Sequence, residues 1–216
     1  MKILGLIGLV ILVGAGTLIL SSSSESALDR LMKGNERFVS GKPLHPDQSA
    51  GRRDEVLSKQ KPFAVIVSCS DSRVPPEIVF DQGIGDLFVV RVAGNIVGPV
   101  ELDSIEYAVD VLNAPFILVL GHQNCGAVNA VMTGKEDSED IQDIAPYILP
   151  AVKKAKGLPG DPLENAIKAN VDLVVESLKK GPVLAKFIKE QKLDIRGAYY
   201  KLEKGQVELL TPSEPK

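Results

Sequence analysis

The sequence predicts an α/β fold in which helices flank a mostly parallel sheet, and three observations lead to this prediction. Short apolar runs rich in β-branched residues occupy 62–68, 86–94 and 114–122, as expected of strands covered on both faces. A helical pattern at 100–113 separates the second run from the third, as in a strand–helix–strand unit of a parallel sheet. Residues 194–210 contain two strand-like runs around a turn at 203–205, which would add an antiparallel edge.

The first 24 residues predict an export segment that precedes the fold. Lys2 is followed by an apolar run over 3–20, interrupted only by glycine and one threonine, and serines follow the run. This order is typical of a cleaved signal peptide, so we expect an exported, periplasmic protein. An uncleaved N-terminal membrane anchor is the alternative, because a run of this length nearly spans a bilayer. A misassigned start is the third reading.

Residues 25–216 are expected to form a single catalytic domain, since a chain of 216 residues needs no second core. The formal net charge is −3, with 25 basic and 28 acidic residues. This balance indicates no nucleic-acid partner and favours a small-molecule one.

The domain begins with a predicted helix over 26–41, capped by Ser26 with Asp29 in the first turn. Its apolar residues fall on one stripe: Leu28, Leu31, Met32, Phe38 and Val39. Residues 42–61 are polar and contain prolines, which predicts a surface connection with a short helix and a solvated His45.

The later helices follow from helical spacing of apolar residues. In 100–113 these residues are Ile105, Ala108, Val109 and Leu112. Further helical patterns cover 125–132, 140–155, 162–180 and 181–191. Pro146 is expected to kink or split the second of these.

Cys69 ends the first buried run and His122 ends the third, in a chain with only two cysteines and two histidines. Ligands of open parallel sheets gather at the carboxyl ends of the strands, so both side chains should enter one crevice. Cys125 should join them from the first turn of the next helix. Two thiolates and an imidazole suit Zn²⁺, and three protein ligands leave one position open, as in catalytic zinc sites. Inert buried cysteines with a satisfied histidine are the alternative.

Export would place the two cysteines in an oxidising compartment, where they could form a disulfide. A metal bound to both thiolates would prevent this oxidation. Zn²⁺ is therefore the predicted cofactor.

Asp71 and Arg73 lie two and four residues beyond Cys69 and would share one side of an extended segment. The arginine would keep the carboxylate ionised through a charge-assisted pair. As a fourth zinc ligand, Asp71 would exclude water; held by Arg73, it would leave that position to a water and accept its hydrogen bond. A purely structural salt bridge is the alternative. Because zinc with two thiolates carries no net charge, activity should rise with pH.

With these residues, the chain resembles the β-class carbonic anhydrases. "CSDSRV" at 69–74 and "GHQNCGAV" at 121–128 are similar to the two zinc-site motifs of the family. "GDLFVVRVAGN" at 85–95 and "LDRLMKGNERF" at 28–38 are similar to its intervening segment and its N-terminal helix. The resemblance runs from about residue 26 to 210. It implies a four-stranded parallel core with an added antiparallel strand, assembled as a homodimer or homotetramer with active sites near the dimer interface.

The same resemblance implies a reaction and roles for the site residues. Cys69, His122 and Cys125 would hold zinc, while Asp71 and Arg73 would gate the metal and orient its water. The implied activity is the reversible hydration of carbon dioxide to bicarbonate and a proton, by attack of zinc-bound hydroxide.

Three further positions come from the resemblance alone. Gln82 and the backbone amide of Gly126 fall near substrate-contacting positions, and Tyr107 would line the pocket. The chain has no tryptophan, so the bicarbonate-regulated site that some members build with one is not expected here.

Other functions remain open from the sequence. Relatives of this family hydrolyse carbonyl sulfide or carbon disulfide, which are linear molecules like carbon dioxide. A non-catalytic exported zinc-binding protein would need the three ligands but neither Asp71 nor Arg73. A thiol-redox enzyme is disfavoured because the chain has no C-x-x-C motif.

Overall fold

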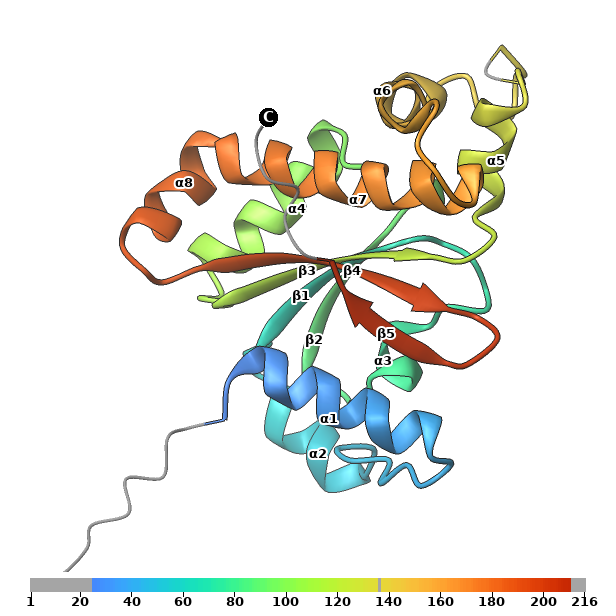
Figure 1. The fold of residues 1–216 in the computed structure, drawn as a ribbon. Helices are drawn as coiled ribbons and strands as arrows, with labels where there is room; N and C mark the ends of the chain where they lie inside the picture. Colours follow the sequence, from blue (N-terminus) through green and yellow to red (C-terminus); the bar gives the residue numbers. More distant parts are fainter. Residues whose placement is uncertain (1–24, 136, 211–216) are drawn as a thin grey trace, which may run out of the picture.

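The computed structural model describes residues 25–135 and 137–210, and its centre is a five-stranded sheet in the order β2-β1-β3-β4-β5 (Figure 1). Four strands run parallel: β1 (Ala64–Ser68), β2 (Leu87–Arg91), β3 (Phe116–His122) and β4 (Asp194–Lys201). β5 (Gln206–Leu209) pairs antiparallel with β4. The predicted parallel core with one antiparallel edge is confirmed.

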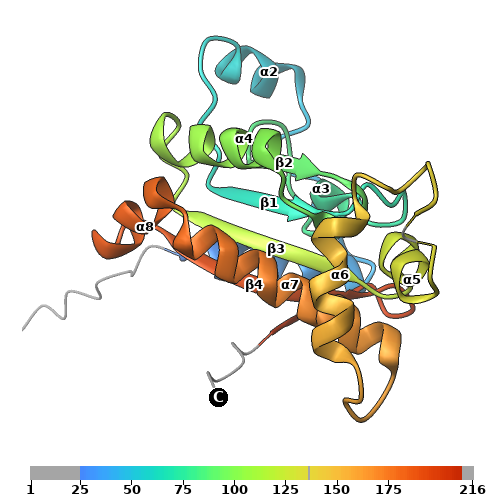
Figure 2. The same ribbon diagram turned by 90° about the horizontal axis from the view of Figure 1, so that it is seen from above.

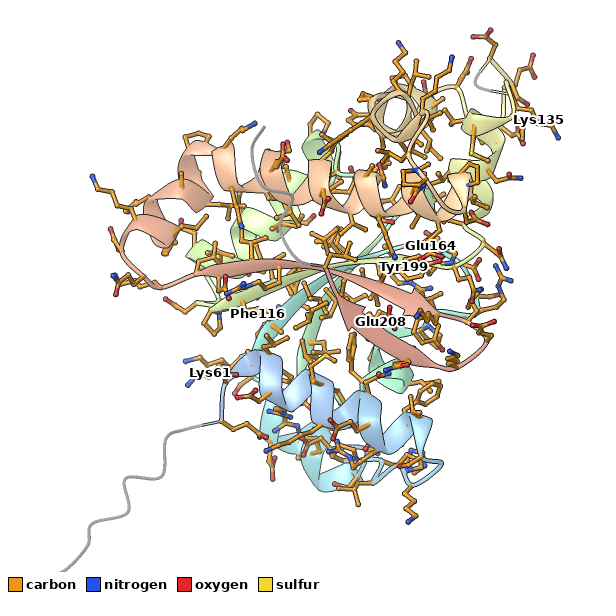
Figure 3. All side chains as sticks on the ribbon, in the orientation of Figure 1. Lys61, Phe116, Lys135, Glu164, Tyr199 and Glu208 are labelled. Atoms are coloured by element: carbon orange, nitrogen blue, oxygen red, sulfur yellow. The ribbon has the colours of Figure 1, made fainter. Side chains whose placement is uncertain are left out.

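Helices cover both faces of the sheet, and the alternation of strand side chains explains why. Val65 and Val67 of β1 pack with α4 (Pro99–Asp110), α7 (Pro162–Lys180) and α8 (Pro182–Lys189). Ile66, between them in sequence, packs on the opposite face with α1 (Ala27–Val39) and α3 (Pro76–Val79). Figure 1 shows these two layers on opposite sides of the sheet, and Figure 2 shows α4, α7 and α8 lying over it. Figure 3 shows side chains filling the space between the layers and the sheet. β1 and β3 are therefore buried throughout.

β2 departs from the prediction that all three apolar runs are covered on both faces. Only Val90 of this strand is buried, and its other four residues are partly exposed. The reason is position: β2 is an edge strand, with β1 on one side only.

α1 begins as predicted, because the Ser26 side chain accepts a hydrogen bond from the Asp29 backbone N–H at 3.1 Å. Leu31 is buried, but Val39 at the end of the predicted stripe is 47% exposed. The helix lies close to the body of the protein at Gly34, where a Cβ would come within 1.8 Å of the Phe80 carbonyl oxygen. The connection 42–61 contains the short α2 (Ala50–Val56) and an exposed His45, as predicted.

The predicted effect of Pro146 is wrong. α6 (Ala145–Ala155) begins beside this proline, which occupies the first turn, where its missing N–H needs no partner. Pro150 is the proline inside the helix. α5 (Gly126–Met132) and α6 pack near the amino end of α7, beyond the carboxyl end of β3 (Figure 1).

Residues 1–24 lie outside the described residues, so the signal peptide, the membrane anchor and the periplasmic location stay predictions. Among residues 25–135 and 137–210, no helix is both long enough and apolar enough to cross a bilayer.

Candidate metal centre

Three side chains converge at the carboxyl ends of β1 and β3. Cys69 directly follows β1, His122 is the last residue of β3, and Cys125 is the N-cap of α5. β1 and β3 are parallel neighbours, with Ser68 opposite Leu120. The two sulfurs and one imidazole nitrogen all lie within 4.8 Å of one another, and all three residues are buried. The two cysteines are free thiols.

The orientation of His122 leaves one ring nitrogen without a partner. Nδ1 lies 2.9 Å from the Gln123 carbonyl oxygen, and because a carbonyl only accepts, Nδ1 carries the proton. Nε2 is buried and has no hydrogen-bond partner among the described residues. A buried imidazole nitrogen of this kind is the usual state of a histidine metal ligand, whose other nitrogen is fixed by a carbonyl.

One of the two thiols ionises easily, but the second thiol then ionises with difficulty. A hydrogen bond from Cys125 lowers the pKa of the Cys69 thiol to about 4, against the opposing effect of burial. The same bond, together with burial, raises the pKa of Cys125. A divalent cation would remove this competition because it stabilises both thiolates.

These residues fit Zn²⁺. Thiolate and imidazole ligands bond to zinc at about 2.0–2.3 Å, which places ligand atoms roughly 4 Å or less apart, close to the spacing seen here. A zinc site is expected to have these ligand types, an imidazole nitrogen without a protein partner, and deep burial, and this group has all three. The predicted cofactor is therefore supported by the geometry of the site.

Asp71 and Arg73 form a partly exposed bidentate ion pair beside this group. Asp71 Oδ1 accepts from Arg73 Nε at 2.9 Å, and Oδ2 accepts from an Arg73 terminal nitrogen at 2.7 Å. Arg73 lowers the pKa of the Asp71 carboxyl far below its usual range, so Asp71 is ionised. Oδ2 also lies 3.9 Å from His122 Nε2.

The backbone around this pair forms a turn, so the prediction of an extended segment is wrong. The Val74 N–H donates to the Asp71 carbonyl at 3.0 Å, and the Arg73 N–H donates to Asp71 Oδ1 at 2.9 Å. The aspartate side chain caps the turn, which brings the two side chains together more closely than alternation along a strand would.

Arg91 lies outside the predicted set, yet it fixes the backbone that carries the site. From the end of β2 it donates to the Cys69 carbonyl at 2.9 Å and to the Asp71 carbonyl at 2.6 Å. Its signal in the sequence is a basic residue that interrupts the apolar run of 87–92.

Gly126 and Gln82, the two predicted substrate-binding residues, lie in different parts of the structure. Gly126 begins α5 directly after Cys125, and its surroundings are open, since a Cβ there would meet nothing within 4 Å. Gln82 is buried beneath α1, where it accepts from Arg30 Nε at 3.0 Å and donates to the Phe80 carbonyl at 2.7 Å. The amide oxygen and the NH2 group of Gln82 each make one of these bonds, and a role toward substrate for Gln82 stays a prediction.

Tyr107 lies on α4 and lines an open groove of about 790 Å³. The groove also contains Lys61, which precedes β1, and Asn113, which precedes β3. It is therefore at the amino ends of these strands, whereas the metal ligands of the same chain lie at the carboxyl ends.

Comparison with known proteins gives consistent matches. A family model described as carbonic anhydrase matches residues 64–207. The carbonic anhydrase of Mycolicibacterium smegmatis is 39% identical over 194 residues, which cover 88% of this chain and 94% of that protein. Carbonic anhydrase 2 of Mycobacterium tuberculosis is 50% identical over 131 residues, which cover 59% of this chain. The match spans 63% of that relative's length, less than two thirds.

Solved structures share the fold. One of two tetrameric β-carbonic anhydrases from the ascomycete Sordaria macrospora matches with a TM-score of 0.63 at 23% identity. That match covers 73% of this chain and 84% of the solved chain. The matched family model, the relatives and the shared fold lead to one conclusion: the chain belongs to the β-class carbonic anhydrase family.

Proposed function

We propose that this protein catalyses the zinc-dependent reversible hydration of carbon dioxide to bicarbonate and a proton. The observation that carries the proposal is the buried Cys69, His122 and Cys125 group beside an ionised Asp71. Zinc in such a site supplies Lewis acidity and lowers the pKa of water, so that a nucleophile is available near neutral pH.

Asp71 and Arg73 are proposed to orient that water rather than to hold the metal. Arg73 occupies both carboxylate oxygens, and Arg91 fixes the backbone carbonyl of Asp71. Oδ1 accepts from both the Arg73 N–H and Arg73 Nε, whereas Oδ2 accepts only from the terminal Arg73 nitrogen and retains a free acceptor position on the side of His122. Asp71 can therefore accept a hydrogen bond from a water beside His122 and direct the lone pair of that water toward the substrate.

The Asp71→Asn substitution tests this role. Asparagine offers one acceptor in place of two and presents N–H groups to Arg73, so the pair should open while the three zinc ligands remain. We expect zinc content near that of the wild type, and a loss in kcat/KM for carbon dioxide hydration of about 10²-fold or more. Metal analysis and stopped-flow hydration assays measure the two quantities.

The chain offers a matched control in Asp194, which pairs with Arg196 at the same spacing. This pair lies at the amino end of β4, and its residues are half exposed. Asp194→Asn should leave the hydration rate unchanged. Full activity in Asp71→Asn would show that the ion pair is only structural. Loss of zinc in this variant would show that Asp71 is a metal ligand.

Substrate choice rests on the same site. Gly126 leaves open space beside Cys125, which supports access for a small linear molecule. Steady-state rates on carbon dioxide, carbonyl sulfide and carbon disulfide compare the proposed substrate with its sulfur analogues. A zinc-loaded protein with no rate above buffer on any of the three would be a zinc-binding protein instead.

We further propose a homodimer or homotetramer. Exposed apolar side chains support an interface at the amino ends of β1 and β3, where Leu57, Tyr107 and Val111 are 85%, 48% and 55% exposed. All three line the groove described above.

A further inference from the structure

A buried asparagine outside the metal-binding motifs is linked to the metal centre by two hydrogen bonds through one glycine. Asn170 lies on α7 and is 1% exposed. Its Nδ2 donates to the Gly94 carbonyl at 2.8 Å, a buried bond between residues 76 positions apart. The Gly94 N–H in turn donates to the Cys69 sulfur at 3.2 Å, also in the interior.

Gly94 can make both bonds because of its backbone conformation. It lies in the short turn η1 (Ala93–Asn95) with φ +72°, a backbone conformation that residues with a side chain rarely adopt. A Cβ at this position would also come within 2.7 Å of Ile148 Cδ1. The N–H therefore faces the sulfur while the carbonyl faces α7, and the position of one group constrains the other.

We propose that Asn170 is a positioning residue for the metal centre: by holding the Gly94 carbonyl, it aims the Gly94 N–H at the Cys69 thiolate. A hydrogen bond to a thiolate withdraws electron density from the sulfur, which then donates less charge to the metal. In a site with two thiolates, this bond keeps the zinc more electrophilic and keeps Cys69 in place. The inference rests on zinc as the resident metal but not on carbon dioxide as the substrate.

The competing explanation is that Asn170 only satisfies a buried carbonyl, as many interior asparagines do. Asn35 provides the comparison within the same chain. It is 3% exposed on α1 and donates to the carbonyls of Val79 and Gly205, and these contacts include none of the proposed metal ligands. Asn35→Leu therefore removes a similar buried amide without touching the metal centre.

The experiment compares Asn170→Leu with Asn35→Leu in the full chain. Zinc affinity is measured by competition with a chelator, and the thiolate-to-metal charge-transfer absorption is measured after replacing zinc with cobalt(II). We expect Asn170→Leu to weaken zinc binding roughly tenfold and to move the cobalt band to longer wavelength, because an unbonded thiolate donates more strongly. Asn35→Leu should lower thermal stability but leave both readouts at the wild-type values.

The inference is overturned if Asn170→Leu loses stability like Asn35→Leu while the cobalt band and the zinc affinity stay at wild-type values. If the leucine variant does not fold, Asn170→Ala removes the same amide without adding a branched side chain, and the same criteria apply. NMR of the ¹¹³Cd-loaded protein adds a direct test: coupling between the Gly94 amide proton and cadmium should be present in the wild type and lost on substitution of Asn170. Unchanged coupling would contradict the proposal. None of these readouts depends on which gas is hydrated, so a failed hydration assay would leave them interpretable.

Discussion

At the scale of single residues, backbone groups take part in holding the candidate metal centre. The Cys69 sulfur accepts from the Gly94 N–H, and His122 Nδ1 is fixed by the Gln123 carbonyl. Asp71 is tied by its own carbonyl to Arg91. These contacts set the direction of each group. The Gln123 contact uses backbone alone, whereas the Gly94 contact needs a glycine conformation and the Asp71 contact needs the Arg91 side chain.

The two histidines of the chain provide a paired test of the metal ligands. His122→Asn removes the orphaned Nε2 and should abolish zinc retention, because two thiolates alone leave the ion without its third protein ligand. His45→Asn is the control, since His45 is exposed and has a φ of +50°, which asparagine tolerates. Metal analysis after dialysis measures both variants. Full zinc content in His122→Asn would refute the assigned ligand set.

At the scale of elements, α1 is attached to the rest of the fold through a buried carboxylate. Asp81 is 3% exposed and accepts from Arg37 of α1 and from the N–H groups of Leu44 and His45. Burial alone would raise the pKa of Asp81, but these donors lower it below the usual carboxyl value. The ionised carboxylate thus joins α1 and the connection after it to the segment that follows α3.

Asp81→Asn should reveal this attachment through its pH dependence. Because the pKa is lower in the folded state, the contribution to stability is present above the usual carboxyl pKa of about 4 and is lost as the pH falls through the folded value. We expect a loss of about 3 kcal/mol near neutral pH, shrinking in acid, by chemical denaturation. The exposed Asp194→Asn should change stability by about 0.5 kcal/mol or less. A loss that is constant between neutral pH and pH 3 would contradict the assigned role.

At the scale of the whole molecule, the sequence predicts the sheet and the metal ligands well because both follow from the same feature. Apolar runs identify buried strands, and Cys69 and His122 occupy the ends of two such runs, which parallel pairing brings together. The turn at Asp71 and the anchoring by Arg91 are not predictable in this way. They depend on local backbone geometry and on a contact across 20 residues, which periodicity does not encode.

The edge position of β2 is a second property that single-strand patterns miss, since residues 87–90 are as apolar as a buried strand. An apolar strand that is partly exposed in one chain is commonly covered in an assembly. Leu57, Tyr107 and Val111 are further exposed apolar side chains, in the groove at the amino ends of β1 and β3. These exposed apolar side chains therefore lead to a prediction about assembly.

We expect residues 25–216, expressed without the predicted export segment, to sediment as a dimer or tetramer of the chain. Val111→Asp should shift the protein toward smaller species, because a charge would be buried in the interface without a partner. Leu158→Asp is the control: Leu158 is 51% exposed, close to the 55% of Val111, but lies between α6 and α7. Analytical ultracentrifugation at several concentrations distinguishes the outcomes. A wild-type monomer would refute the assembly, whereas an oligomer that is weakened by Leu158→Asp and not by Val111→Asp would place the interface on the α6–α7 side instead.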